Sequence, residues 1–184
     1  MKEITIPDSV KEIESYCFHS CRSLTQIELS TSLTKLGKHC FYGCSSLEKI
    51  IIPDSVKEIG FRCFCKCENL TEIILSTNIT KLSYECFYDC RNLQSINIPS
   101  TIMYLPDECF SQCSKLKKIK LSKNIKEIGE CCFYNCKNLS LSTFQLNKKI
   151  NNYQLITSTT ILKYILLLII SIFSSILFYF IIIN

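Results

Sequence analysis

Cysteine is the residue type in this chain with the most chemical potential, at 14 of 184 residues. Twelve of these form pairs four residues apart that recur every 23 residues: Cys17/Cys21, Cys40/Cys44, Cys63/Cys67, Cys86/Cys90, Cys109/Cys113 and Cys132/Cys136. Thiolates can hold zinc, but zinc ligands converge on one point, whereas these pairs continue in a line. Disulfides within a pair are disfavoured because helical neighbours rarely present the required Cβ geometry. We expect mostly buried free thiols that act as small apolar side chains, with disulfides between units as the open alternative.

The remaining cysteines, Cys65 and Cys131, lie outside the two repeating columns. The other members of the two columns in which they stand are mostly tyrosine, histidine and charged residues, which face outward, so we expect these two thiols to be exposed and modifiable. His19 and His39 occupy different columns and have no recurring acidic or nucleophilic partner. The sequence therefore predicts no catalytic site, no cofactor, no metal and no small-molecule substrate. An enzyme would require an exposed Cys65 or Cys131 beside a base.

The cysteine pairs belong to a longer repeat that runs without insertion or deletion. Three apolar columns show the same step of 23 residues: Ile4, Ile27, Ile50, Ile73, Ile96, Ile119; Phe18, Phe41, Phe64, Phe87, Phe110, Phe133; and Leu24, Leu47, Leu70, Leu93, Leu116, Leu139. A fixed period of this length is typical of a solenoid, in which each unit buries its apolar face against its neighbours. We therefore predict one solenoid domain of six units over residues 1–139.

One unit contains a strand pattern followed by a helical pattern. Residues 26–30 alternate between polar and apolar, which predicts a short strand that pairs in parallel with the equivalent strand of the next unit. Cys40, Cys44 and Leu47 have spacings of three and four, which predicts one helical turn. The predicted fold class is a repeat solenoid with short parallel strands and one helical turn per 23-residue coil.

The consensus L-x-x-I-x-[IL]-[PS]-x-x-[VLI]-x-x-[IL]-x-x-x-C-F-x-x-C-x-x-L resembles the BspA-like leucine-rich repeat of bacterial and protist surface proteins. The resemblance covers residues 1–139. One departure is consistent, because that family usually carries a small residue such as alanine before the phenylalanine, and cysteine stands there in every unit. The resemblance implies a leucine-rich-repeat solenoid that is not an enzyme and that functions in adhesion or protein binding, often at a cell surface.

The composition changes after Leu139. Residues 164–183 carry no charge, and 20 helical residues span about 30 Å, which is the thickness of a bilayer's hydrocarbon core. We predict a linker over 140–160 and a transmembrane helix over 161–183, tail-anchored because no signal peptide precedes the repeats. The lysines on the amino-terminal side of this segment keep the repeats in the cytosol. The alternatives are a cell-surface location, a soluble intracellular scaffold, or a fragment of a longer surface adhesin whose tail is not an anchor.

The outward strand positions are the expected binding face of such a solenoid. Ile51 and Ile74 occupy adjacent units there and form a small apolar patch with a polar rim, which suits a protein partner of unknown identity. The other predicted partner-binding residues are Glu28, Lys49, Glu72 and Asn97. The alternative interpretation is that the isoleucines only favour the strand conformation.

Basic residues collect toward the carboxyl end of the repeats. The formal net charge is +5, which is too modest and too local to indicate nucleic-acid binding. Each lysine near an anionic leaflet contributes about 1 kcal/mol of attraction, so the lysine cluster favours contact with a membrane surface. The predicted contact residues are Lys117, Lys118, Lys120, Lys148, Lys149 and Lys163. The combined prediction is a non-enzymatic interaction module tethered to a membrane.

Overall fold

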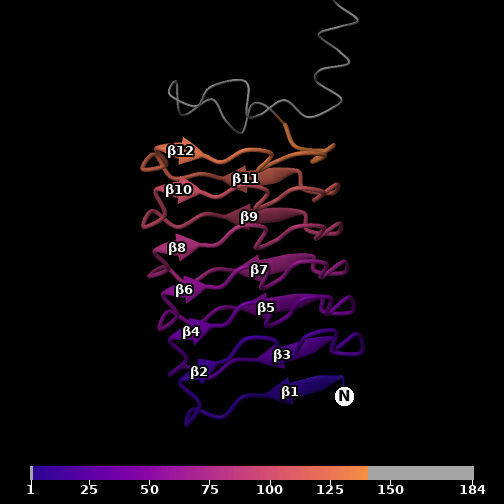
Figure 1. The fold of residues 1–184 in the computed structure, drawn as a ribbon, viewed down its shortest axis with the longest axis vertical. Helices are drawn as coiled ribbons and strands as arrows, with labels where there is room; N and C mark the ends of the chain where they lie inside the picture. The colour runs from indigo at the N-terminus through magenta and orange to yellow at the C-terminus, as the bar shows by residue number, and fades with distance from the viewer. Residues whose placement is uncertain (1, 141–184) are drawn as a thin grey trace, which may run out of the picture.

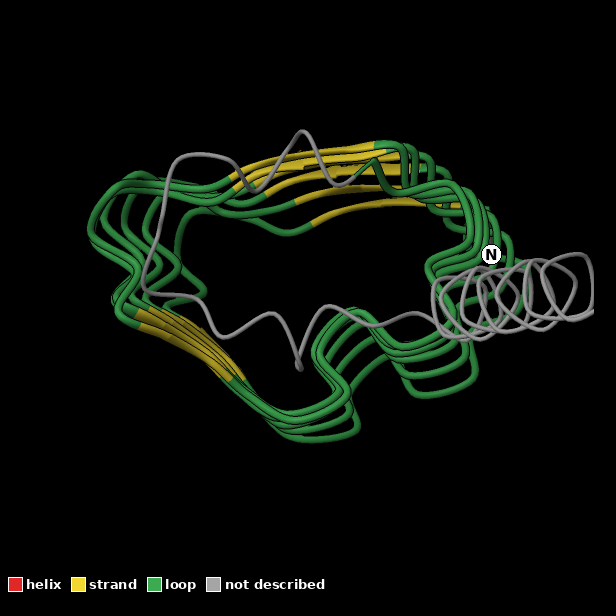
Figure 2. Cartoon of the chain, turned by 90° about the horizontal axis from the view of Figure 1, so that it is seen from above, coloured by secondary structure: helices red, strands yellow, loops and turns green. Residues whose placement is uncertain are grey.

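The structure is a computed structural model and describes residues 2–140. Six coils stack into a rod, and each coil contributes one strand to a broad sheet and one to a narrow sheet (Figure 1). The coils comprise residues 2–24, 25–47, 48–70, 71–93, 94–116 and 117–139. Seen along the rod, the coils superimpose, with the two sheets on opposite sides and turns at the ends (Figure 2).

The broad sheet is six-stranded and parallel. Its strands are β1 (Glu3–Thr5), β3 (Gln26–Glu28), β5 (Lys49–Ile51), β7 (Glu72–Ile74), β9 (Ser95–Asn97) and β11 (Lys118–Lys120), in that order. Residues 23 positions apart are register partners, as with Ile4 and Ile27 or Ile50 and Ile73. The middle residue of each strand points into the core and its two neighbours point outward. The predicted parallel strands and their register are confirmed.

The narrow sheet is interrupted. The strands β2 (Glu12–Ile13), β4 (Lys35–Leu36), β6 (Glu58–Ile59) and β8 (Lys81–Leu82) form one ladder, while β10 (Tyr104–Leu105) and β12 (Glu127–Ile128) form another. In coils two, three and six, a glycine after the strand donates its N–H to the preceding coil; Gly60, for example, donates to the Leu36 carbonyl at 3.0 Å. Pro106 occupies this position in coil five and has no N–H, so the bond to Leu82 cannot form.

The predicted helical turn is wrong, because no helix occurs within residues 2–140. The segment is instead a series of tight turns with N–H bonds to the carbonyl three residues earlier, such as Cys44 to Phe41 at 3.1 Å. Two positions in this segment adopt the left-handed conformation; in coil two they are His39 (φ 53°) and Gly43 (φ 68°). Left-handed residues at this spacing cannot belong to an α-helix, whose residues all have negative φ.

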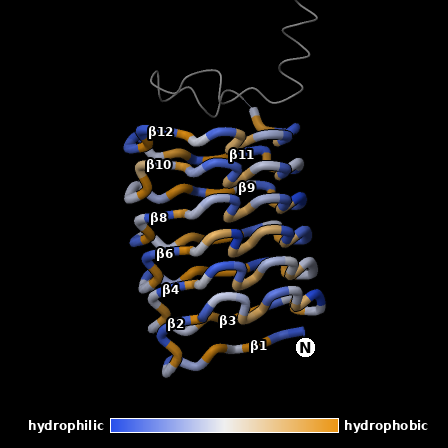
Figure 3. Tube along the Cα trace, viewed as in Figure 1, coloured by the Kyte–Doolittle hydropathy of each residue, from blue (hydrophilic) through white to orange (hydrophobic). Residues whose placement is uncertain are grey.

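The core is one continuous apolar column. The five phenylalanines from Phe41 to Phe133 are fully buried, and each ring is stacked on the next at centroid distances of 5.3–5.6 Å. Phe18 stacks on Phe41 at 5.2 Å but is only partly buried, because no coil covers its other face within the described residues. Apolar residues alternate with polar ones along every coil (Figure 3). The stacking therefore buries each unit against its neighbours, as the repeat predicts.

The buried thiols have a regular role in this core. In coils two to six, the second cysteine of the pair donates its S–H to the phenylalanine carbonyl of the preceding coil, as Cys67 does to Phe41 and Cys90 to Phe64, both at 3.1 Å. All fourteen thiols are free, and burial raises the pKa of Cys44 and Cys136 to about 12. The predicted burial is confirmed for all paired cysteines except Cys17, which is exposed, and Cys21, which is half-buried.

The remaining predictions of domain boundaries fall largely outside the described residues. The linker from 141 onward and the predicted transmembrane helix over 161–183 lie there. Between residues 2 and 140, no helix has the length and apolar character needed to cross a bilayer.

Candidate functional site

The outer face of the broad sheet presents two side-chain columns, because the first and third residue of every strand point away from the core. The column formed by the third residue of each strand has two apolar residues at its centre and polar or charged residues on either side. That column reads Thr5, Glu28, Ile51, Ile74, Asn97 and Lys120. Ile51 is 64% exposed and Ile74 is 50% exposed. Single exposed apolar side chains are ordinary, but two in adjacent coils form a patch, so the pair is a candidate contact for a partner.

A salt bridge borders the isoleucine pair. Lys49 Nζ lies 3.2 Å from Glu72 Oε2, and the parallel register places the two residues directly beside one another. Both side chains are more than half exposed, so this pair contributes at most about 1 kcal/mol to folding. The polar rim predicted around the apolar patch is present in this form.

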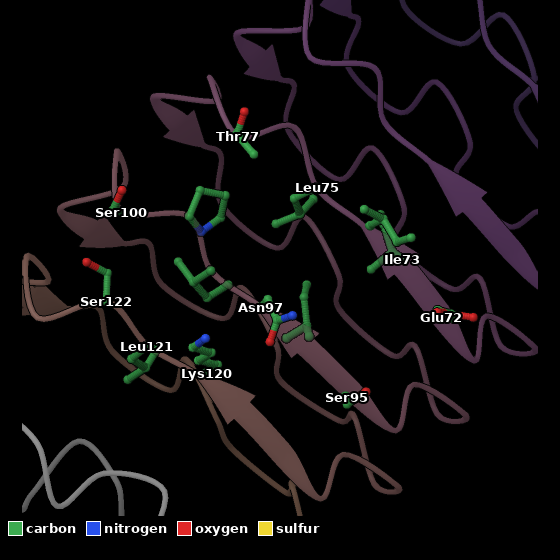
Figure 4. Close-up of a pocket in the computed structure, with 14 residues that line it drawn as sticks. Glu72, Ile73, Leu75, Thr77, Ser95, Asn97, Ser100, Lys120, Leu121 and Ser122 are labelled. Atoms are coloured by element: carbon green, nitrogen blue, oxygen red, sulfur yellow. The ribbon is translucent and has the colours of Figure 1, made fainter.

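Two hollows flank the isoleucine pair and meet at Glu72 and Ile74. The first crosses coils two to four and is lined in part by Glu28, Lys49 and Ile51. The second crosses coils four to six; Figure 4 shows its side chains, among them Asn97 and Lys120, projecting from neighbouring coils. All six residues predicted to bind a partner therefore lie on one shallow groove that runs along the rod: Glu28, Lys49, Ile51, Glu72, Ile74 and Asn97.

The lysines predicted to contact a membrane are only partly described. Lys117, Lys118 and Lys120 lie in coil six and are all exposed. Lys120 also lines the second hollow, so this residue borders the same groove as the isoleucine pair. Lys148, Lys149 and Lys163 lie outside the described residues.

The two histidines sit in aromatic stacks that the sequence analysis missed. Tyr16 stacks on His39 at 4.8 Å, and His19 stacks on Tyr42 at 5.0 Å. Desolvation, then the nearby charge of Arg62, lowers the pKa of His39. The available signal was that each histidine stands 23 residues from a tyrosine. Each histidine ring is stacked face to face on a tyrosine ring of the other coil, so the two histidines help to pack coil one onto coil two.

The two cysteines outside the columns differ in environment. Cys131 is exposed, as predicted. Cys65 is only 2% exposed, so the prediction of an accessible thiol there is wrong. Burial raises the pKa of Cys65 to about 12, which leaves almost no reactive thiolate at neutral pH. No group of three or more histidine, cysteine or acidic residues within 2–140 is arranged to hold a metal ion.

A second exposed apolar group lies beside the interruption of the narrow sheet and was also missed. Tyr84, Met103 and Tyr104 are exposed there, next to the buried Pro106. The sequence did contain a signal for this group, because Tyr104 stands in a column whose other members alternate between glutamate and lysine. That column reads Glu12, Lys35, Glu58, Lys81, Tyr104 and Glu127.

Parallel 23-residue coils, a stacked phenylalanine column and a strand-lined outer face together define a leucine-rich-repeat solenoid. The chain belongs to the family described as the BspA type leucine rich repeat region, which matches residues 1–113 and 34–163 in six copies. The resemblance read from the cysteine and phenylalanine columns is thus confirmed. Proteins of this class are generally non-enzymatic and bind other proteins.

Two solved structures from bacteria have a similar fold. A leucine-rich-repeat protein of T. pallidum (TpLRR) matches with a TM-score of 0.65 and 22% identity over 81% of this chain and 85% of its own. A leucine-rich cell surface protein of Faecalibacterium prausnitzii matches with a TM-score of 0.62 and 26% identity over 76% of this chain. The match spans 46% of the F. prausnitzii chain, less than half its length. No curated protein matches the chain in sequence.

Proposed function

We propose that the chain is a non-enzymatic interaction module that binds a protein partner through the groove on the outer face of the broad sheet. The observation that carries this proposal is the exposure of Ile51 and Ile74 in adjacent coils, between two hollows. Isolated exposed apolar residues are ordinary, whereas adjacent ones with a polar rim are the usual centre of a protein contact.

The strand preference of isoleucine does not account for this pair by itself. The equivalent positions in the other four coils carry threonine, glutamate, asparagine and lysine, and their strands form equally well. Polar residues are therefore sufficient for strand formation at this position. Ile51 is 64% exposed and Ile74 is 50% exposed, so burial of what remains exposed would contribute about 1–2 kcal/mol each, which is enough for a measurable contact.

The same proposal includes a membrane tether. We infer it from the uncharged run within residues 161–183 and from the exposed lysines of coil six, including Lys117, Lys118 and Lys120. On this basis the repeats face the cytosol, with Lys148, Lys149 and Lys163 close to the bilayer. The F. prausnitzii structure is described as a cell surface protein, which favours the surface alternative. A scaffold or adhesin fragment without a functional anchor is the remaining candidate.

The binding face is tested with the double variant Ile51→Asp/Ile74→Asp in the full chain. Cross-linking mass spectrometry in cells should lose the partner peptides that attach to coils two to five. Both side chains are exposed, so the free energy of unfolding of the variant should lie within about 1 kcal/mol of that of the parent protein. Met103→Asp is the matched control, because Met103 is equally exposed but lies on the opposite side of the coil. Unchanged cross-links in the isoleucine variant would exclude this face.

The tether is tested by extracting membranes with alkaline carbonate and digesting the intact vesicles with protease. Sedimentation with membranes and complete digestion of the repeats is the expected result. Sedimentation with protected repeats would instead place them on the outer side. A chain that stays in the supernatant would contradict the tether and leave the interaction module as a soluble scaffold.

A further inference from the structure

Charge is segregated along the groove of the broad sheet. The first and third strand positions and the third residue after each strand carry five acidic residues and one lysine in coils one to four, no charge in coil five and three lysines in coil six. The acidic members are Glu3, Asp8, Glu28, Asp54 and Glu72, and the basic members of coil six are Lys118, Lys120 and Lys123. Lys49 is the basic exception among these positions in coils one to four and is paired with Glu72. The groove therefore runs from a negative end, across the isoleucine pair, to a positive end.

Glu28, Lys118 and Lys120, which lie on either side of the isoleucine pair, are not neutralised within the described part of the chain. Glu28 accepts one hydrogen bond, from the Thr5 hydroxyl at 3.3 Å, and no ion pair within residues 2–140 involves Glu28, Lys118 or Lys120. All three are exposed. Unpaired charges of opposite sign at the two ends of an apolar centre select a partner whose charges have the reverse order.

The fold restricts the shape of that partner. Strands β3, β5, β7 and β9 are paired on both sides, so a partner cannot add a strand anywhere along the centre of the groove. The outward strand positions also carry no aromatic residue, and aromatic side chains are what bind polyproline segments. An amphipathic helix laid along the groove is the recognition mode that fits an apolar centre between charged ends. Its apolar residues at positions i and i+4 lie about 5–6 Å apart. That spacing matches the coil spacing of about 4.8 Å between Ile51 and Ile74.

We propose that the groove binds one amphipathic helix of a partner protein, oriented by charge. The helix has apolar residues at its centre over Ile51 and Ile74, basic residues over coils one to three, and acidic residues over Lys118 and Lys120. Coils one to six span about 24 Å, which corresponds to about 16 helical residues. The proposal rests on the proposed function, because it specifies the partner of the same face.

The test uses synthetic helical peptides of about 16 residues and the full-length protein, with binding measured by fluorescence anisotropy. The first peptide has glutamates in its first turn, leucines at its centre and lysines in its last turn, an order that also stabilises the helix through its dipole. The second has the same composition with glutamates and lysines interleaved. Exchanging the two ends would be a poor control, because a helix can reverse its direction in the groove.

The segregated peptide should bind at least about tenfold more tightly than the interleaved one at low ionic strength, and the difference should shrink in high salt. Lys118→Glu/Lys120→Glu should remove that preference, and Ile51→Asp/Ile74→Asp should abolish binding of both peptides. The retained circular dichroism spectrum of each variant shows that the fold is intact. These variants replace exposed side chains, so folding is expected to persist.

Three outcomes would overturn the charge-oriented helix. Equal affinity for the two peptides would show that charge order is not recognised. Failure of both peptides to bind would show that the groove does not accept a helix, and the proposed function would stand if the cellular cross-links still depend on Ile51 and Ile74. Binding to vesicles containing phosphatidylserine, lost in Lys118→Glu/Lys120→Glu with no peptide binding, would assign these lysines to a lipid surface.

Discussion

Coil one and coil four carry the same motif in different environments. In coil four, Cys86, Phe87 and Cys90 are fully buried, whereas in coil one the equivalent Cys17 is exposed and Phe18 is only partly buried. Both coils make the same hydrogen bonds to the coil that follows them: Phe18 N–H donates to Cys40, and Phe87 N–H to Cys109, both at 2.9 Å. The difference lies entirely in the coil before.

The comparison shows that burial in this solenoid depends on both neighbours of a coil. Coil four is covered from both sides, and its phenylalanine ring has a stacked ring on each face, Phe64 and Phe110. Among residues 2–140, coil one has a neighbouring coil on one side only, where Phe18 stacks on Phe41. Stability per coil therefore comes from interfaces between coils, and a coil with one interface contributes less.

The largest expected difference is in thiol reactivity. Cys17 and Cys131 should alkylate more than about a hundredfold faster than Cys86, because a buried thiol reacts only when the coil opens. Burial and the neighbouring Cys40 raise the pKa of Cys17 as well, so it should react more slowly than a free thiol. Pulsed alkylation with peptide mass spectrometry measures each rate, and the same reaction in denaturant is the control. Similar rates for Cys17 and Cys86 would contradict the comparison.

Ring deletion in the two coils comes next. Phe87→Ala should lower the free energy of unfolding by about 3–5 kcal/mol, because the ring is fully enclosed and leaves a cavity. Phe18→Ala should cost about 1–2 kcal/mol, because this ring already contacts solvent. Urea denaturation followed by circular dichroism measures both. Equal costs would mean that Phe18 is covered in solution.

The hydrogen bonds of Asp8 in coil one and of Asp54 in coil three should contribute equally to stability. Asp8 accepts hydrogen bonds from the Thr31 N–H and hydroxyl, each at 2.9 Å, and Asp54 accepts the same two bonds from Thr77 at 2.8 and 3.0 Å. Both bonds join a coil to the one that follows. Asp8→Ala and Asp54→Ala should therefore each cost about 1 kcal/mol in urea denaturation. A negligible cost for Asp8→Ala alone would show that coil one frays.

The smallest expected effect concerns pH and the junction of coil one. His39 contacts the rings of Tyr16, Tyr42 and Phe61, and its pKa is lowered by desolvation, Arg62, His19 and Lys38 against the opposing effect of Glu85. Because the folded state disfavours the protonated form, His39 contributes stability above its unfolded pKa of about 6.5, and this is lost as pH falls through the lower folded value. His39→Phe should flatten the decrease in melting temperature between pH 7 and pH 5. An unchanged slope would exclude His39.

The sequence predicted what depends on the period, namely the strand register, the apolar columns and the exposed isoleucines. It did not predict the turns at the cysteine pairs, because the left-handed positions carry residues such as Tyr16, Arg62 and Glu85, which give no signal for positive φ. The spacing of Cys40, Cys44 and Leu47 also imitates a helix. A one-dimensional period therefore specified the stacking better than the path of each coil.

Cys65 shows why exposure was harder to predict than register. Its column holds His19, Tyr42 and Tyr88, which suggested an outward position. A small side chain between two tyrosines is covered by them, and Ser111, between Tyr88 and Tyr134 in the same column, is likewise only 1% exposed. The two hollows on the broad sheet likewise depend on the relative sizes of side chains from several coils. No single position in the sequence could therefore indicate them.

Pro106 has a consequence for the mechanics of the rod. The broad sheet is hydrogen-bonded from end to end, whereas the narrow sheet lacks bonds between β8 and β10. A beam that is fastened continuously on one side and notched on the other bends toward its intact side, and a crack under tension starts at the notch. Under load we therefore expect the rod to flex between coils four and five, with the broad sheet as the hinge line.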